Sequence, residues 1–225
     1  MRHHILLLGG SGICGIIFAR AALAAGHSLT LYVRTPLKVP EDIRSHVDVS
    51  IIQGQLDDVE RLRQAASCGA DTFVSFAGPT LGSKDGTPIT SALKLLYPML
   101  LESGTINRVL VLSTPSYPAP EDTHSLKWFT AIHCYIRLLG GDTYKEINGI
   151  SNATTELGDK VAWTIFRVPL LKGTRLDEND GDVAEAFVGN GKDGLSLDRG
   201  RLALWVLKEM DEKKWVRLCP LISNA

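Results

Sequence analysis

The chain has 225 residues, which is enough for one α/β domain with a substantial core. Lys and Arg number 24 against 25 Asp and Glu, with no basic run, so we expect neither a nucleic-acid nor a membrane partner. No apolar segment is long enough to span a bilayer. The four cysteines lie far apart without a Cys-x-x-Cys pair, which favours reduced thiols in a cytoplasmic protein and no metal site.

A glycine-rich turn near the N-terminus follows the first predicted strand, 4–8, and opens a helix that runs to about residue 23. Gly9, Gly12 and Gly15 are spaced three apart. A dinucleotide-binding turn needs glycines to reverse the chain, to admit a pyrophosphate and to let helix pack on strand. A secretory signal peptide is the alternative, but the glycines and Arg20 interrupt the apolar run. The segment therefore predicts a nucleotide-binding turn.

Strand and helix patterns alternate through most of the remaining chain. Further strands are predicted at 28–33, 47–52, 72–76, 108–112 and 163–167, and helices at 57–66, 91–102, 126–139 and 144–157. This order predicts an α/β fold with a doubly wound, mostly parallel Rossmann sheet. We expect a single domain over 1–225, in which residues 170–200 form a small, loop-rich C-terminal lobe on the substrate side. A short strand at 186–188, a helix at 201–211 and a closing strand at 215–219 complete the prediction.

Arg34 at the end of the second strand bears on the choice of cofactor. Ligands of such sheets bind at the carboxyl ends of the strands, and NAD-preferring sites usually place an acidic residue at this point. A guanidinium instead suits the 2′-phosphate of NADP, because it can bind two of its oxygens. The sequence therefore favours NADP(H) over NAD(H), with an ordinary surface arginine as the alternative.

Six segments together resemble the atypical short-chain dehydrogenase/reductase superfamily, in particular its NmrA-like and biliverdin-reductase-B-like NAD(P)H-binding members. These segments are Leu8-Gly9-Gly10-Ser11-Gly12-Ile13-Cys14-Gly15, Tyr32-Val33-Arg34, Gln53-Gly54-Gln55-Leu56, Val74-Ser75-Phe76-Ala77-Gly78, Val111-Leu112-Ser113-Thr114 and Trp163-Thr164-Ile165-Phe166-Arg167-Val168-Pro169. The resemblance covers nearly the whole chain but does not identify a substrate.

The resemblance implies a role for each cofactor-binding residue. It places the pyrophosphate at Gly9, Ser11, Gly12 and Ile13, the 2′-phosphate at Arg34, adenine beside Leu56, the ribose at Ala77 and Gly78, and the nicotinamide near Pro169. Gln55 stands where many relatives have aspartate, which leaves a hydrogen bond to the adenine amino group open.

The catalytic residues are less well defined, because the Tyr-x-x-x-Lys motif of classical members is absent. Tyr144 is the nearest match, with Asn148 in the place of lysine, and without a nearby ammonium a tyrosine is a weak acid. Ser113, at the end of the fifth strand, is the candidate for polarising a carbonyl, and satisfying loop backbone is its alternative role. We therefore expect Ser113→Ala to slow catalysis more than Tyr144→Phe. For His124 and His133 we favour solvated positions over catalytic ones.

The sequence thus predicts an NADP(H)-dependent oxidoreductase that acts on a carbonyl or conjugated double bond of a small, mostly apolar molecule. We expect it to be a monomer or a homodimer. A non-catalytic NADP(H)-binding sensor of the NmrA type is an alternative, as is an isomerase or dehydratase on the same fold. The compact length without an added interaction domain favours the enzyme.

Overall fold

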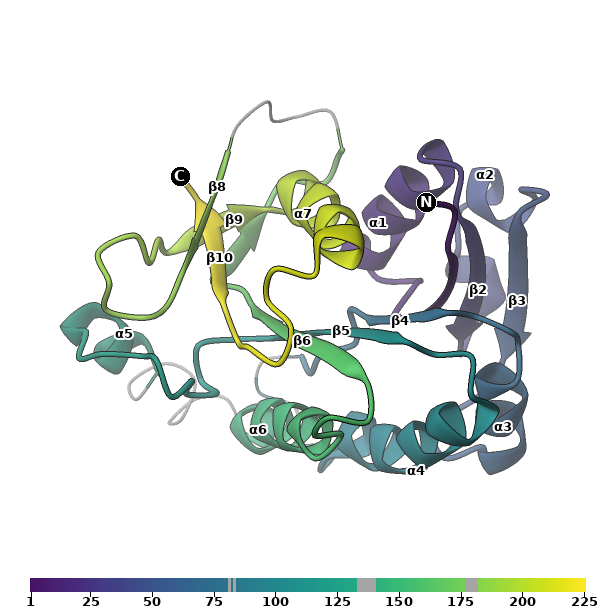
Figure 1. The fold of residues 1–225 in the computed structure, drawn as a ribbon, viewed down its shortest axis with the longest axis horizontal. Helices are drawn as coiled ribbons and strands as arrows, with labels where there is room; N and C mark the ends of the chain where they lie inside the picture. The colour runs from purple at the N-terminus through teal and green to yellow at the C-terminus, as the bar shows by residue number, and fades with distance from the viewer. Residues whose placement is uncertain (81, 83, 133–140, 177–181) are drawn as a thin grey trace.

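A parallel sheet forms the centre of the computed structural model, which describes residues 1–80, 82, 84–132, 141–176 and 182–225. The strand order of the eight-stranded sheet is β3-β2-β1-β4-β5-β6-β10-β8. All neighbouring pairs are parallel except β10 with β8. Figure 1 shows α3, α4 and α6 against one face of the sheet, and α1, α2 and α7 against the other. This is the predicted doubly wound Rossmann arrangement.

The elements of the N-terminal half alternate as the sequence predicts. In chain order they are β1 (His4–Leu8), α1 (Ile13–Ala24), β2 (Ser28–Val33), η1 (Pro36–Lys38), α2 (Glu41–Arg44), β3 (Val49–Gln53), α3 (Val59–Ala66), β4 (Thr72–Ser75), α4 (Pro88–Ser103) and β5 (Arg108–Ser113).

The C-terminal half contributes the remaining strands and a second, small sheet. Its elements are α5 (Leu126–Thr130), α6 (Thr143–Thr155), β6 (Ala162–Arg167), β7 (Leu170–Lys172), β8 (Val183–Ala186), β9 (Ser196–Asp198), α7 (Arg199–Glu212) and β10 (Leu221–Asn224). β7 and β9 pair in parallel as a two-stranded sheet outside the main one. The helix expected at 126–139 is observed as α5, and its part from residue 133 lies outside the described residues.

The strand β1 explains why the sheet is covered on both faces. Leu6 and Leu8 pack into the core beneath α3, α4 and α6, whereas Ile5 and Leu7 pack into the core beneath α1 and α7. Successive side chains of a strand point to opposite faces, so a strand buried on both sides is apolar throughout. Each of these four side chains is at most 4% exposed.

A histidine fastens the start of β1 to the end of α7. His3 Nδ1 lies 2.7 Å from Asp71 Oδ1, and His3 Nε2 lies 3.0 Å from Asp211 Oδ1. Burial alone would lower the pKa of His3, but its hydrogen bonds to Asp211 and Asp71 outweigh burial and raise that pKa above its ordinary value. Folding therefore favours the protonated form of His3 relative to the unfolded chain.

The prediction of a closing strand at 215–219 is wrong. Residues 214–217 form turns, Arg217 has a φ of 60°, and the strand is β10, which begins after Pro220. The buried carboxylate of Glu209 accepts hydrogen bonds from Lys214 N at 3.2 Å and Trp215 N at 2.9 Å. These bonds hold the segment against the end of α7, so its apolar alternation does not produce a strand. The short strand expected at 186–188 is also shifted, to β8.

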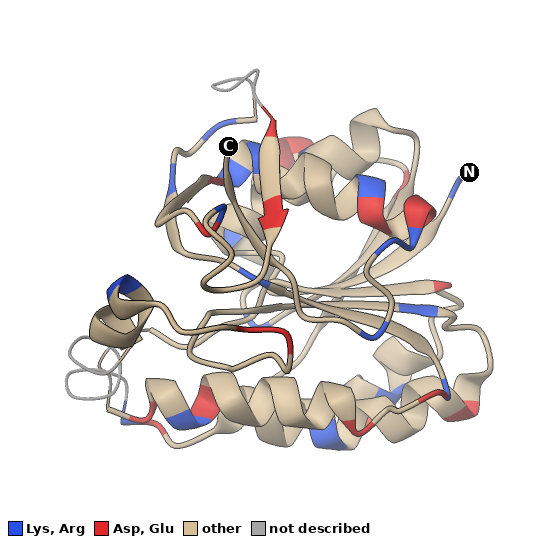
Figure 2. Ribbon diagram, turned by 60° about the vertical axis from the view of Figure 1, so that its left-hand side comes forward, with Lys and Arg blue, Asp and Glu red and all other residues tan. Residues whose placement is uncertain are grey.

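Charged residues are dispersed over the molecule. Figure 2 shows Lys and Arg interspersed with Asp and Glu on both helical layers rather than gathered into a band of one sign. No helix in the described ranges has the length and apolar character that crossing a membrane requires.

Candidate functional site

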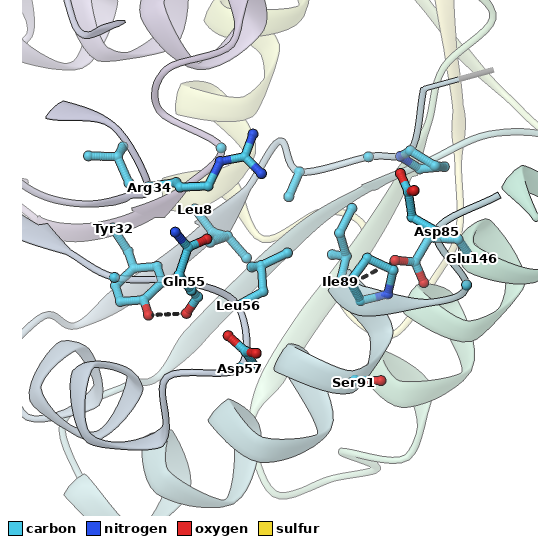
Figure 3. A pocket seen from close by; sticks show the side chains of 18 of the residues that line it. Leu8, Tyr32, Arg34, Gln55, Leu56, Asp57, Asp85, Ile89, Ser91 and Glu146 are labelled. Atoms are coloured by element: carbon cyan, nitrogen blue, oxygen red, sulfur yellow. Dashed lines mark hydrogen bonds between the residues drawn. The ribbon is translucent and has the colours of Figure 1, made fainter. Parts of the chain in front are cut away.

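A cavity of about 610 Å³ opens at the carboxyl ends of β1, β2, β3 and β4. It extends from Arg34, Gln55 and Leu56 past the glycine-rich turn to the start of α4 and the first turns of α6. Figure 3 shows Arg34, Gln55 and Leu56 at one end and Asp85 and Glu146 at the other. In open α/β sheets this edge is where ligands bind.

The glycine-rich turn lies at the middle of the cavity. Gly9 has a φ of 83°, and a Cβ there would lie 2.7 Å from Ala77 N, so the turn rests directly on the end of β4. A Cβ on Gly15 would lie 2.3 Å from Gly9 O, so this glycine lets α1 pack on the turn. A Cβ on Gly12 would meet only Gly9 O, at 3.4 Å, which leaves its outer side open for a ligand.

The first turns of α1 and α4 differ in how their backbone amides are satisfied. Helix α1 starts after Gly12 with no side-chain cap and no acidic residue in its first turn. Beside α4, the buried Glu146 carboxylate accepts hydrogen bonds from Ile89 N at 2.6 Å and from Thr90 N at 3.2 Å. A carboxylate of the protein therefore already occupies the anion-binding position of α4. A phosphate ligand would find open amides at α1.

A buried tyrosine holds the loop that follows β3 at the Arg34 end of the cavity. Tyr32 Oη donates to Gln55 O at 2.6 Å, and burial together with Asp58 and Asp57 raises the pKa of Tyr32 to about 12. A Cβ on Gly54 would lie 2.3 Å from Tyr32 Oη, so only glycine fits above the ring. The tyrosine thus fixes the loop that presents Gln55 and Leu56 to the cavity.

The charges around the cavity are unequally distributed. Arg34 is exposed and is the only Lys or Arg among the described residues that line the cavity, whereas Asp57, Asp85, Asp142 and Glu146 contribute carboxylates. Asp142 accepts a hydrogen bond from Gly86 N at 3.1 Å, and Glu146 binds the start of α4. An anionic group in this cavity would therefore be attracted to Arg34 and to the amides of α1.

The structure brings most of the expected cofactor residues together. Six of them line the cavity, namely Gly9, Ser11, Arg34, Leu56, Ala77 and Gly78. Gly12, Ile13, Pro169, Ser113 and Tyr144 do not line it. Gly12 and Ile13 begin α1 beside the turn, and Ile13 is 49% exposed.

Ser113 ends β5 as predicted, but its hydroxyl is turned into the protein. Ser113 Oγ lies 2.7 Å from Ser151 Oγ of α6, and Ser151 Oγ donates to Ile147 O at 3.0 Å. A hydroxyl has one proton, so Ser151 must accept the proton of Ser113. The two serines are at most 2% exposed.

Tyr144 and Asn148 occupy successive turns of α6, where a classical enzyme has tyrosine and lysine. Asn148 Nδ2 lies 2.8 Å from Tyr144 O and 3.4 Å from Ser116 O. Asn148 therefore fastens α6 to the turn after β5 and supplies no positive charge. Of the two histidines weighed with them, His124 is exposed and His133 lies outside the described residues.

A buried ion pair, which the sequence pattern did not reveal, organises the segment after β5. Arg167 at the end of β6 is 0% exposed and binds both oxygens of Asp122, at 2.6 and 2.7 Å. Asp122 Oδ2 also accepts from Ala119 N at 2.7 Å, and Oδ1 accepts from Val188 N at 2.9 Å. One carboxylate thus joins the loop after β5 to β6 and to the segment after β8.

Cys14, in the first turn of α1, is a packing residue. It is half-buried against the core beneath α1 and α7, and burial raises its pKa despite the opposing effect of Arg199. A thiol with a raised pKa is a poor nucleophile at neutral pH. The interpretation of Cys14 as a small apolar side chain is therefore the better one.

Comparison with known proteins is consistent with this geometry. The chain matches the NAD(P)H-binding family over residues 9–213, and no curated protein sequence matches it. A short-chain dehydrogenase/reductase (wide type) from Veillonella parvula, solved in complex with NADP, is similar in structure with a TM-score of 0.76 at 18% identity, over 99% of this chain and 95% of that one. The oxidoreductase ylbE from Lactococcus lactis gives a TM-score of 0.73 at 16% identity, over 99% and 91% of the two chains.

A candidate NADH-flavin reductase from Streptococcus pneumoniae gives a TM-score of 0.69 at 17% identity, over 99% of this chain and 100% of that one. At such identities the likeness of structure shows the fold, whereas the family match spans most of the sequence. The chain therefore belongs to the NAD(P)H-binding family and has the Rossmann fold of the short-chain dehydrogenases/reductases.

Proposed function

We propose that the protein binds NADP(H) in this cavity and transfers hydride between the cofactor and a carbonyl or conjugated double bond of a small, mostly apolar molecule. The observation that carries the proposal is the place of Arg34, at the carboxyl end of β2 and alone among the described lining residues in its positive charge. A 2′-phosphate there would meet a guanidinium able to bind two of its oxygens.

Six of the nine expected cofactor residues line this cavity, and Gly12 and Ile13 lie beside it where α1 begins. Gly9, Ser11, Gly12 and Ile13 would hold the pyrophosphate at the open amides of α1. Leu56 would flank adenine, Ala77 and Gly78 would line the ribose, and Pro169 would approach the nicotinamide. Bound NADPH supplies the hydride, and the protein orients its nicotinamide ring toward the acceptor.

Two exposed leucines near Pro169, where we propose that the nicotinamide lies, support an apolar acceptor. Leu170 follows Pro169 directly and is 68% exposed, and Leu195 is 53% exposed. Leu170 N donates to Leu195 O at 3.2 Å, so the two residues are neighbours. They belong to the segment 170–200, which we propose to be the substrate-side lobe.

The variant Arg34→Ala tests the cofactor preference. Loss of charge-assisted hydrogen bonds worth about 1.5–3 kcal/mol should weaken NADPH about 10- to 150-fold and leave NADH nearly unchanged. The measurement is a fluorescence titration of both cofactors against the parent, the variant and Arg63→Ala, which removes an exposed arginine of α3 outside the cavity. An equal loss for both cofactors would show that Arg34 does not bind the 2′-phosphate.

A non-catalytic NADP(H) sensor is the second candidate, and Asn148 in the place of lysine is the observation that favours it. An isomerase or dehydratase would also need no tyrosine–lysine pair of the classical kind. Oxidation of NADPH with a panel of aldehydes, ketones, quinones and enones separates these functions. Tight NADPH binding with no turnover of any acceptor would favour the sensor.

A further inference from the structure

A short loop after β3, residues 54–57, forms the wall of the cavity at the Arg34 end. The loop follows the last residue of β3 directly, and all four of its residues line the cavity. Figure 3 shows the side chains of Gln55 and Leu56 at the same end of the cavity as Arg34. A ligand held by Arg34 would therefore have this loop as its neighbour.

Three hydrogen bonds join the loop and the last residue of β3 to the end of β2. They run from Tyr32 Oη to Gln55 O at 2.6 Å, from Gly54 N to Val33 O at 3.2 Å and from Gln53 Nε2 to Arg34 O at 3.4 Å. The bond from Tyr32 is the shortest of the three. The Tyr32 hydroxyl is therefore the main attachment of the loop to β2, and Figure 3 shows this bond as a dashed line.

The surroundings of Gly54 leave the loop no room to shift toward the sheet. A Cβ on Gly54 would lie 2.3 Å from Tyr32 Oη on one side and 2.7 Å from Arg61 Cβ of α3 on the other. Tyr32 itself is 4% exposed and packs into the core beneath α3, α4 and α6. The loop thus passes between a buried ring and a helix. A binding loop that is ordered in advance loses less conformational entropy when a ligand binds.

We infer that Tyr32 is a positioning residue for the cofactor, whose hydrogen bond to Gln55 O holds the loop 54–57 in place for the adenosine half of the dinucleotide. The inference rests on the proposed cofactor site. NADPH and NADH share the adenosine half, whereas Arg34 would contact a phosphate that only NADPH carries. Loss of the Tyr32 hydroxyl should therefore weaken both cofactors by the same factor, and loss of Arg34 should weaken NADPH alone.

The test compares Tyr32→Phe with the matched control Tyr97→Phe in the whole chain. Tyr97 is also 4% exposed and packs in the same core, but it is not among the described residues that line the cavity. Tyr97 Oη donates to Thr154 Oγ1 at 2.7 Å, since Thr154 gives its own proton to Ile150 O. The readouts are the unfolding midpoint and the dissociation constants of NADPH, NADH and adenosine 2′,5′-bisphosphate, which carries only the adenosine end.

Tyr32→Phe should weaken all three ligands about 3- to 10-fold, the usual effect of one intramolecular hydrogen bond. The ratio of NADPH to NADH affinity should change by less than about twofold, because the phosphate contact is untouched. Tyr97→Phe removes an equivalent bond and should lower the unfolding midpoint about as much, but all three affinities should stay within about twofold of the parent. Gly54→Ala, whose Cβ would displace the Tyr32 hydroxyl, should weaken the ligands at least as much as Tyr32→Phe.

Parent-like affinities for Tyr32→Phe, or equal losses of affinity for Tyr32→Phe and Tyr97→Phe, would overturn the inference while leaving the cofactor site in place. A loss for NADPH with no loss for NADH would overturn it as well, since Tyr32 would then act on Arg34 and not on the loop. A parent that binds none of the three ligands would overturn the proposed function, and the role of Tyr32 with it.

Discussion

The ion pair between Arg167 and Asp122 gives the sharpest test of how the loop after β5 is held against β6 and the segment after β8. Each oxygen of Asp122 accepts two hydrogen bonds, one from the guanidinium and one from a backbone amide. In Asp122→Asn, either orientation of the amide would place its NH₂ group against two of these donors. The change would also leave the fully buried guanidinium without its counter-charge. We expect a loss of about 3–5 kcal/mol in the free energy of unfolding, the usual effect of breaking a buried pair.

A matched control is available on the surface. Arg20 binds both oxygens of Asp42, at 2.8 and 3.2 Å, but these side chains are 45% and 55% exposed. Asp42→Asn should therefore cost less than about 1 kcal/mol. Thermal unfolding would separate the two variants, since a loss of 3–5 kcal/mol corresponds to about 6–20 °C in a chain of this size.

Hydrogen exchange adds a local measurement. The amides of Ala119 and Val188 should exchange faster in Asp122→Asn, because each loses its acceptor or meets a donor in its place. Equal midpoints for Asp122→Asn and Asp42→Asn would refute the idea that burial makes the Asp122 pair stabilising.

Two further predictions concern the turn and the N-terminal histidine. Gly12→Val should abolish NADPH binding, as judged by titration, but leave the unfolding midpoint nearly unchanged, because its side chain would project into the space for the pyrophosphate; Gly15→Ala should instead lower the midpoint, since its Cβ would lie 2.3 Å from a backbone oxygen. NADPH binding by Gly12→Val would place the phosphates elsewhere. His3 has a raised pKa, so its stabilising contribution is fully present below the ordinary value near 6.5 and is lost as pH rises through the folded-state value. Urea unfolding from about pH 6 to 9 should show this loss in the parent but not in His3→Asn, and parallel curves would contradict it.

The cofactor side of the molecule could be predicted because its determinants are local in the sequence. Gly9, Gly12 and Gly15 lie within one turn, and each strand end that faces the cavity directly follows an apolar run. The periodicity of these runs fixes which ends meet at one edge of the sheet. Arg34 directly follows the last residue of β2, so the end of that apolar run is enough to predict its place at the cavity.

The surroundings of Ser113 and of the start of α6 depend on contacts between distant parts of the chain, which periodicity does not encode. Ser151 lies 38 residues after Ser113, and Asp122 lies 45 residues before Arg167. Glu146 satisfies the start of α4 across 57 residues. The misplaced closing strand has the same origin, because the backbone of 214–215 follows the buried carboxylate of Glu209 rather than its own alternating pattern.

The replacement of lysine by asparagine at position 148 connects the fold to the chemistry. A lysine there would bring a positive charge one turn from Tyr144 and could favour its phenolate. It would also remove the amide that bonds to Ser116 O and Tyr144 O, since an ammonium on a long, flexible stem has no equivalent planar geometry. Asn148 thus holds the turn after β5 against α6 and supplies no positive charge of its own at this position. Under the proposed oxidoreductase function, such a site would suit acceptors that take hydride without strong acid catalysis.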